Sequence, residues 1–181
     1  MDIALTQFIN GLSGQSATLD AAVVFITKVG VPVLIALTVL HWWSGGPTRL
    51  EVRRTCLQAG LAFVLGLAMN QIVLLFVHRA RPYDQGVTHL LIPPSPDWSF
   101  PSDHATAVTA IVAAFLLAGM GRRAGLLSLI AVPVLLSRVY VGTHFVTDVL
   151  GGMATGVIAA LVVRALYPTG SRLDRWVTGL F

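Results

Sequence analysis

Five long apolar stretches constrain the fold of this chain more than any other feature. They run roughly over Ala21 to Trp43, Cys56 to Val77, Ala105 to Met120, Ala124 to Val141 and Val146 to Leu166. About 20 helical residues, each rising about 1.5 Å, cover the ~30 Å hydrocarbon core of a bilayer, and the third and fourth stretches reach that length only with adjoining polar turns. Alternating ten-residue strands are absent, so a membrane β-barrel is excluded. The sequence predicts an all-α membrane protein with about five transmembrane helices in one bundle.

The composition supports this class. Of 181 residues, 55% are apolar and 11% are charged, whereas about a quarter of the residues in a soluble domain carry a charge. We expect a single domain over residues 1–181. The lone Cys56 permits neither an internal disulfide nor a multi-cysteine metal site, and we expect it to pack as a small apolar side chain.

An amphipathic helix is predicted over residues 1–19, ahead of the first span. Ile3, Leu5 and Phe8 recur on one face, while Gln7 and Asn10 take the other. Such a helix lies in the membrane interface with its apolar face in the lipid. No basic segment precedes this helix, and no small-residue cleavage site follows it closely. We therefore expect that it is not cleaved as a secretory signal.

The distribution of basic residues predicts the orientation. With five spans, three connections lie on one side and carry eight of the twelve bases: Arg49, Arg53, Arg54, Arg122, Arg123, Arg164, Arg172 and Arg175. The positive-inside rule makes this side, including the tail over residues 167–181, cytoplasmic. The N-terminus and a proline-rich loop over residues 78–104 then lie outside. The basic excess therefore indicates topology and anionic membrane lipids as partners, and we expect no nucleic acid partner.

The remaining ionisable residues gather on the outer side in three segments. These are His78-Arg-Ala-Arg-Pro82, Ser99-Phe-Pro-Ser-Asp-His104 and the stretch from Ser137 to Asp148. Ionisable groups at membrane depth are costly, so a cluster of them indicates a functional site. His144 and Asp148 are four residues apart, which on a helix places them within side-chain reach. A carboxylate that holds one imidazole nitrogen leaves the other available as a nucleophile or a metal ligand.

Two arginines and a helix start favour an anionic substrate at this site. Arg81 and Arg138 carry planar guanidinium groups, which bind phosphate oxygens in pairs and stay charged. Ser102 and Asp103 precede the third span, where backbone N–H groups form an anion site. Together with His104 and His144, these residues indicate phosphoryl transfer.

Three alternatives remain for these residues. The two histidines and Asp148 match the donor types of a metal site, although two arginines at the same point would oppose a cation. Ser102 with His104 as its base is a possible nucleophile, but the segment lacks the glycines of a nucleophile elbow. Each arginine, taken alone, is also suited to anchoring lipid headgroups at the interface.

The three segments resemble the signature of the type 2 phosphatidic acid phosphatase superfamily. In order, the matching residues are Arg81-Pro82, Pro101-Ser-Asp-His104, and Ser137-Arg138 followed by Gly142, His144 and Asp148. The resemblance extends from about Asn70 to Gly152. The Pro-Ser-Asp-His variant, Phe8-Ile-Asn-Gly-Leu, Leu19-Asp20 and Phe25-Ile-Thr-Lys28 are similar to the bacitracin-resistance type of undecaprenyl-diphosphatase.

The resemblance implies a mechanism and a location. His144, oriented by Asp148, would attack phosphorus, and His104 would protonate the leaving group and then activate water. Arg81, Arg138, Ser102, Asp103 and Gly142 would form the phosphate-binding part, with no metal or other cofactor. The substrate would be a polyprenyl diphosphate in a bacterial inner membrane, at a site facing the periplasm or cell exterior. No obligate protein partner is implied.

One position departs from the family pattern. A lysine usually stands seven residues before the arginine of the Arg-Pro step, and this chain has Leu74 there. Arg79 and Lys28 are candidates to replace the missing charge, and Lys28 is included in the predicted phosphate site. Alternatively, Lys28 reaches only lipid headgroups.

Two other functions stay open from the sequence. The same chemistry would serve another lipid phosphate, such as phosphatidate or phosphatidylglycerol phosphate. A protein of a different class, a non-catalytic binder or transporter of lipid phosphates, would use the arginines only to hold its ligand.

Overall fold

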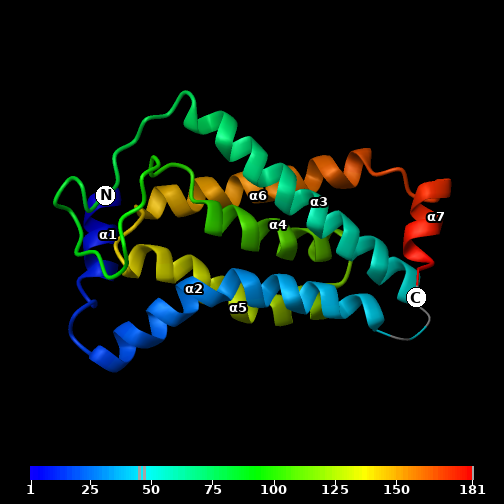
Figure 1. Ribbon diagram of the computed structural model, residues 1–181, viewed down its shortest axis with the longest axis horizontal. Helices are drawn as coiled ribbons and strands as arrows, with labels where there is room; N and C mark the ends of the chain where they lie inside the picture. Colours follow the sequence, from blue (N-terminus) through cyan, green and yellow to red (C-terminus); the bar gives the residue numbers. More distant parts are fainter. Residues whose placement is uncertain (45, 47, 181) are drawn as a thin grey trace.

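A computed structural model describes residues 1–44, 46 and 48–180. All regular secondary structure in this part of the chain is helical, as predicted (Figure 1). The helices are α1 (Asp2–Asn10), α2 (Ala17–Leu40), the 3-10 turn η1 (His41–Trp43), α3 (Arg49–Leu74), α4 (Asp103–Leu117), α5 (Gly121–Tyr140), α6 (Val146–Leu166) and α7 (Arg172–Thr178).

In the part of the chain that the structure describes, four helices, rather than the expected five, have the length and apolar composition to cross a membrane. The α2 segment, which continues through η1, and α3, α5 and α6 meet this criterion, whereas α4 has only 15 residues. At about 1.5 Å per residue, α4 is shorter than the ~30 Å hydrocarbon core. It lies inside the bundle between the longer helices (Figure 1). The third apolar stretch is therefore a central helix that protein covers on most sides.

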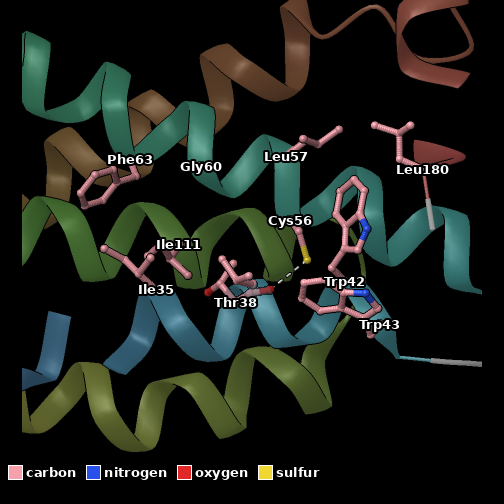
Figure 2. A pocket seen from close by; sticks show the side chains of 11 residues that line it. Ile35, Thr38, Trp42, Trp43, Cys56, Leu57, Gly60, Phe63, Ile111 and Leu180 are labelled. Atoms are coloured by element: carbon pink, nitrogen blue, oxygen red, sulfur yellow. Dashed lines mark hydrogen bonds between the residues drawn. The ribbon is translucent and has the colours of Figure 1, made fainter. Parts of the chain in front are cut away.

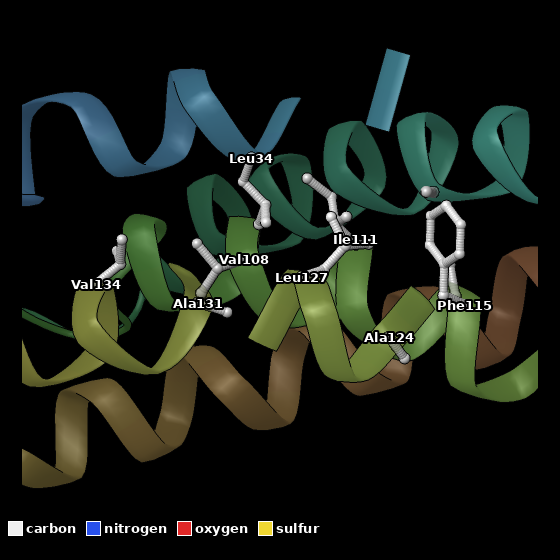
Figure 3. Close-up of a cluster of buried hydrophobic side chains, with 10 residues drawn as sticks. Leu34, Val108, Ile111, Phe115, Ala124, Leu127, Ala131 and Val134 are labelled. Carbon is white, nitrogen blue, oxygen red and sulfur yellow. The ribbon is translucent and has the colours of Figure 1, made fainter. Parts of the chain in front are cut away.

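The apolar core forms where α4 meets α2 and α5. Leu34 from α2, Ile111 and Phe115 from α4, and Leu127 from α5 are at most 2% exposed and belong to one buried cluster (Figure 3). Outward-facing residues of the long helices, such as Leu129 of α5, are exposed and suited to lipid. The small residues of α4, mostly alanines, allow four helices to surround it.

Two glycines bring α6 into close contact with α4. Gly152 and Gly156 lie one turn apart on α6, a spacing typical of membrane helix contacts. A Cβ atom on Gly156 would lie 2.6 Å from the carbonyl oxygen of Thr106 and 2.8 Å from the amide nitrogen of Ala110. On Gly152 it would collide with the carbonyl oxygen of Ser102. The start of α4 is thereby positioned directly on the backbone of α6.

The predicted N-terminal helix is shorter than residues 1–19 and turns its polar face toward the protein. It ends at Asn10, and α2 begins at Ala17 after Ser16 caps its N-terminus. Asn10 donates to the carbonyl oxygens of His89 and Tyr140, at 2.9 and 2.8 Å. Phe8, in contrast, is 75% exposed. Since buried polar groups require partners, α1 uses them to dock on the bundle and leaves its apolar face outward.

The polar clusters lie at opposite ends of the bundle (Figure 1). At one end, α1 and the loop between α3 and α4 cover the start of α6. At the other end, α7 folds back on α3, where Arg54 and Asp174 form an ion pair at 2.9 Å. The buried guanidinium of Arg53 donates to the carbonyl oxygens of Trp42 and Thr178. Two of the eight arginines that predict topology thus also attach the C-terminal helix.

Candidate active site

A polar pocket of about 130 Å³ opens beside the N-terminus of α4. Its walls come from the end of α3, the following loop, α4, α5 and the turn between α5 and α6. The lining residues are Leu74, Arg81, Ser95, Asp97, Trp98, Pro101, Asp103, His104, Arg138 and His144. Both predicted histidines and both predicted arginines therefore share one cavity, although 63 residues separate Arg81 from His144 along the chain.

The proton position on His144 follows from its two neighbours. His144 is 4% exposed, and its Nδ1 lies 2.8 Å from the carbonyl oxygen of Ser99, which can only accept. Its Nε2 lies 3.3 Å from Nη1 of Arg81, which can only donate. The proton is therefore on Nδ1 and the lone pair on Nε2. Burial, followed by the charges of Arg138 and Arg81, lowers the pKa of His144 to about 4 despite the nearby carboxylate of Asp148, which acts in the opposite direction.

Asp148 lies behind His144, fully buried in the first turn of α6. Its Oδ2 accepts from the amide of Phe145 at 2.8 Å and from the hydroxyl of Ser99 at 2.5 Å. The same oxygen is 3.7 Å from Nδ1 of His144, beyond normal hydrogen-bond length. The predicted proximity of His144 and Asp148 is confirmed, but Ser99 stands between their hydrogen-bonding groups.

Arg81 is held in the pocket by the loop before α4. It is 5% exposed, and its Nη2 forms an ion pair with the carboxylate of Asp97 at 2.7 Å. Its Nε and Nη1 donate to the carbonyl oxygens of Asp97 and Thr143, both at 3.0 Å. Burial acts to raise the pKa of Asp97, but the hydrogen bonds from Ser95 and Arg81 together outweigh it, so the pKa lies below its usual value. Asp97 thus occupies a guanidinium edge suited to an anion.

Arg138 and Ser102 bring unpaired buried atoms to this region. Arg138 is 7% exposed, and its Nη1 donates to Thr27 of α2 at 2.5 Å, whereas its Nε has no partner. The Ser102 hydroxyl, fully buried at the N-cap of α4, also lacks a partner, although Ser102 does not line the pocket. Buried polar atoms without partners are costly, so they are natural points for a bound ligand.

His104 and Asp103 enter the pocket from the first turn of α4. Asn70 of α3 donates to the Asp103 carboxylate at 2.7 Å and to the Thr106 hydroxyl at 2.9 Å. Asn70 is fully buried, so it connects α3 to α4 directly beneath the site. The sequence placed the start of the family resemblance at Asn70 but assigned it no role.

Two residues expected in the phosphate site, Lys28 and Gly142, do not line the pocket, whereas Leu74 does. Lys28 is exposed on α2 and does not line the pocket. Gly142 also lies outside the lining; its φ of +82° and the nearby carbonyl of His89 show that it serves the turn after α5. Leu74 does line the pocket, so the position of the family lysine faces the site with an apolar side chain.

The sequence reasoning missed Asp97 and Ser99 and did not place Arg79. Arg79 lies outside the pocket and donates to Asp148 at 2.6 Å and to Asp2 at 2.6 Å. Asp97 lies in the proline-rich loop, whose path no periodic pattern predicts. Ser99 opens one of the three polar segments, which was the available signal for it.

A second pocket, of about 390 Å³, lies toward the opposite end, between α2 and α3 (Figure 2). Cys56 projects into it and donates to the carbonyl oxygen of Thr38. The lining residues are Ile35, Thr38, Val39, Trp42, Trp43, Cys56, Leu57, Gly60, Phe63, Ile111 and Leu180. This lining contains no charged residue, so the chemistry belongs to the polar pocket. Among the described residues, no three His, Cys, Asp or Glu side chains are grouped to hold a metal ion.

The chain belongs to the PAP2 superfamily, because residues 55–172 match that family and include every residue of the polar pocket. Among curated relatives, undecaprenyl-diphosphatase BcrC of Bacillus subtilis is 36% identical over 159 residues, covering 87% of this chain and 80% of the relative. Putative undecaprenyl-diphosphatase YbjG of Escherichia coli is 28% identical, covering 92% of this chain and 83% of the relative.

The fold is that of transmembrane members of the superfamily. The crystal structure of Aquifex aeolicus LpxE superposes with a TM-score of 0.71 at 22% identity, covering 91% of this chain and 94% of LpxE. The PAP2-type phosphatidylglycerolphosphate phosphatase of Bacillus subtilis gives a TM-score of 0.63 at 23% identity, covering 94% and 86% of the two chains. The protein is therefore a multi-pass membrane protein.

Proposed function

We propose that this protein hydrolyses undecaprenyl diphosphate to undecaprenyl monophosphate and inorganic phosphate. The observation that carries the proposal is the convergence of two imidazoles and two guanidinium groups on one small pocket. The names of two relatives, BcrC and YbjG, support the choice of substrate. Phosphoryl transfer depends mainly on positioning and on stabilising charge at the phosphate oxygens, and this pocket is suited to both.

His144 is the nucleophile in this proposal. Its Nε2 carries the lone pair and faces the pocket, while Nδ1 remains bound to the carbonyl oxygen of Ser99. Nε2 attacks the terminal phosphorus, the bond from phosphorus to the bridging oxygen breaks, and undecaprenyl monophosphate leaves. The phosphoryl group is then covalently attached to His144.

His104 and the arginines complete the reaction. His104 protonates the departing oxygen, then takes a proton from water, which attacks the phosphohistidine and releases phosphate. Arg81, Arg138 and the Ser102 hydroxyl bind the phosphoryl oxygens as their charge shifts. Asp97 must release Arg81 for this to occur, and the unpaired Nε of Arg138 gains a partner.

The proposed location is the bacterial plasma membrane, with the polar pocket at the outer face and the C-terminus in the cytoplasm. The arginine-rich end of the bundle, opposite the pocket, supports this orientation through the positive-inside rule. The substrate lipid would approach from the outer leaflet, and membrane lipids would surround the exposed apolar faces.

Phosphate release from undecaprenyl diphosphate by the purified protein in detergent tests the proposal. We expect turnover in the presence of a chelator, and loss of it of about 10⁴-fold or more in His144→Ala, because the nucleophile is removed. With substrate labelled at the terminal phosphate, quenching in alkaline denaturant, which preserves the acid-labile phosphohistidine, should leave label on wild type but not on His144→Ala. Inactivation by the chelator would favour a metal site instead.

A second candidate is the same chemistry on another lipid phosphate. Phosphatidylglycerophosphatase B of Bacillus subtilis is 33% identical over 58% of this chain, which favours including such lipids. Phosphatidate and phosphatidylglycerol phosphate should therefore be compared with undecaprenyl diphosphate in the same assay. A higher kcat/KM for either would assign this second function.

A third candidate is a non-catalytic binder or transporter. One relative, from Bacillus licheniformis, bears the name bacitracin transport permease protein BcrC and is 29% identical over 90% of this chain. Binding a phosphate requires no nucleophile, so removal of His144 distinguishes a binder or transporter from a phosphatase. Bacitracin resistance that survives His144→Ala in cells would favour the transporter.

A further inference from the structure

The buried Asp148 is paired with a guanidinium that the proposed reaction does not use. Asp148 has no exposed surface, and a buried carboxylate requires an opposite charge close by. The imidazole of His144 does not supply it, since its Nδ1 is bound to the carbonyl of Ser99. Nη1 of Arg79 does, at 2.6 Å from Oδ1 of Asp148.

Arg79 is itself held in place by the N-terminal helix. Its Nη2 pairs with Asp2 at 2.6 Å, and its Nη1 also donates to Thr147 at 2.7 Å. Asp2 accepts from both the amide and the hydroxyl of Thr147, at 3.1 and 2.5 Å. The guanidinium lies 4.0 Å from the ring centre of Phe145. The first turns of α1 and α6 thus clamp Arg79 from both sides.

The connections continue from Asp148 to the nucleophile through Ser99. The Ser99 hydroxyl donates to Oδ2 of Asp148, and the Ser99 carbonyl accepts from Nδ1 of His144. The Ser99 amide donates to the carbonyl oxygen of Arg79 at 2.8 Å. Arg79 therefore contacts both Asp148 and Ser99, the two residues that position the Nδ1 proton of His144. It does not line the substrate pocket.

We propose that Arg79 is a positioning residue for His144, acting through Asp148 and Ser99, and that Asp2 makes the amphipathic helix α1 part of this apparatus. The inference rests on the proposed phosphatase function. Loss of Arg79 leaves the Asp148 carboxylate without its cation, so it recruits the Nδ1 proton of His144 and displaces the ring. A misplacement of about 1 Å suffices for a large loss of rate.

Steady-state kinetics of Arg79→Gln test the role. We expect kcat to fall about 100-fold while KM stays within about threefold, because the residue acts on the nucleophile and not on the substrate. Asp2→Asn should show a smaller loss of the same kind, and Arg172→Gln, at an exposed arginine of α7, is the matched control. A rise in KM with an intact kcat would make Arg79 a substrate ligand and overturn the proposal.

A double-mutant comparison separates positioning from a purely structural contribution. If Arg79 acts through Asp148, adding Arg79→Gln to Asp148→Asn should lower kcat by less than about twofold. Fully additive losses would contradict the proposal. Arg79→Lys should recover part of kcat, because it restores the charge next to Asp148 but not the fork to Asp2.

A spectroscopic readout does not depend on the substrate. In wild type, ¹⁵N-labelled histidine should show His144 protonated at Nδ1, with its signals assigned by their absence in His144→Gln. In Arg79→Gln we expect the Nδ1–H signal of His144 to shift downfield, because the proton moves from the Ser99 carbonyl to the Asp148 carboxylate, which is the stronger acceptor. If wild type cleaves no lipid phosphate, the proposed function fails while this measurement still decides the role of Arg79. An unchanged Nδ1–H signal in Arg79→Gln would refute that role.

Discussion

At the scale of single residues, the site is defined by groups whose hydrogen-bonding roles cannot change. A carbonyl only accepts and a guanidinium only donates, so Ser99 and Arg81 together determine where His144 keeps its proton. The imidazole is also shielded from water, which disfavours its charged form. Both effects keep Nε2 unprotonated and nucleophilic near neutral pH.

The titration of His144 should therefore be displaced toward acid. Its pKa is lowered to about 4, mainly by burial, so the ring stays neutral from pH 7 down to about 5 and gains its proton only near pH 4. In ¹⁵N-histidine spectra recorded against pH, the His144 signals should have a midpoint near 4. A midpoint close to the ordinary value of about 6.5 would show that the ring is hydrated.

The carboxylate of Asp97 competes with a bound phosphate, because it forms an ion pair with the guanidinium of Arg81. Asp97→Asn removes a negative charge that competes with the phosphate for the guanidinium. We expect inorganic phosphate to inhibit this variant about tenfold more strongly, equivalent to about 1.4 kcal/mol. The inhibition constant measures this, and Asp84→Asn, at an exposed loop carboxylate that does not line the pocket, is the control. Weaker inhibition would mean that Asp97 organises Arg81 rather than blocking it.

At the scale of elements, the contact between α4 and α6 positions the chemistry. α4 carries His104, and α6 carries Asp148. Their separation is set by glycines on α6, whose missing side chains let the two backbones meet. At the far end, α7 is attached by Asp174, whose pKa is lowered to about 2, chiefly by the hydrogen bonds from Arg54. The bundle is therefore secured at both ends.

Gly156→Ala tests the close contact between these helices. A methyl group there would meet backbone atoms of α4 that no side-chain rotation relieves, so we expect a loss of about 1–3 kcal/mol of stability. Thermal unfolding in detergent measures it. Gly125→Ala, on α5 with open space around its Cβ position, should be neutral or slightly stabilising. Equal unfolding temperatures for Gly156→Ala and wild type would contradict the close approach.

At the scale of the whole molecule, the chain separates its charges along the bundle. The acidic and histidine groups of the pocket share one end with α1, and most arginines occupy the other (Figure 1). Such a separation both orients a helical bundle in the membrane and keeps a polar site near one surface. The short helix α4 helps to place the polar site near one surface, because the first turn of α4 lines the pocket.

Labelling of single cysteines tests the orientation. In a Cys56→Ser background, Gln85→Cys in the loop between α3 and α4 and Arg172→Cys in α7 provide one exposed thiol at each end. We expect a membrane-impermeant maleimide to label Gln85→Cys on intact cells, and Arg172→Cys only after permeabilisation. The reverse pattern would place the pocket in the cytoplasm.

The sequence by itself determined the all-helical membrane class, the approximate positions of the long helices and the two histidines and two arginines of the pocket. Apolar runs and basic connections are local properties, and the cost of burying ionisable groups made His104, His144, Arg81 and Arg138 stand out. It also predicted that His144 and Asp148 would be neighbours, because that spacing is a property of a single helix.

Only the tertiary structure decided how these residues are connected. The pairing of Arg79 with Asp2 and Asp148 joins residues 77 and 69 positions apart, which no periodicity predicts. The structure also showed that the central helix is short, that Lys28 does not line the pocket, and that α1 docks by its polar face. Partners across the bundle are set by packing between helices, and the sequence of one helix carries no information about which neighbour will face it.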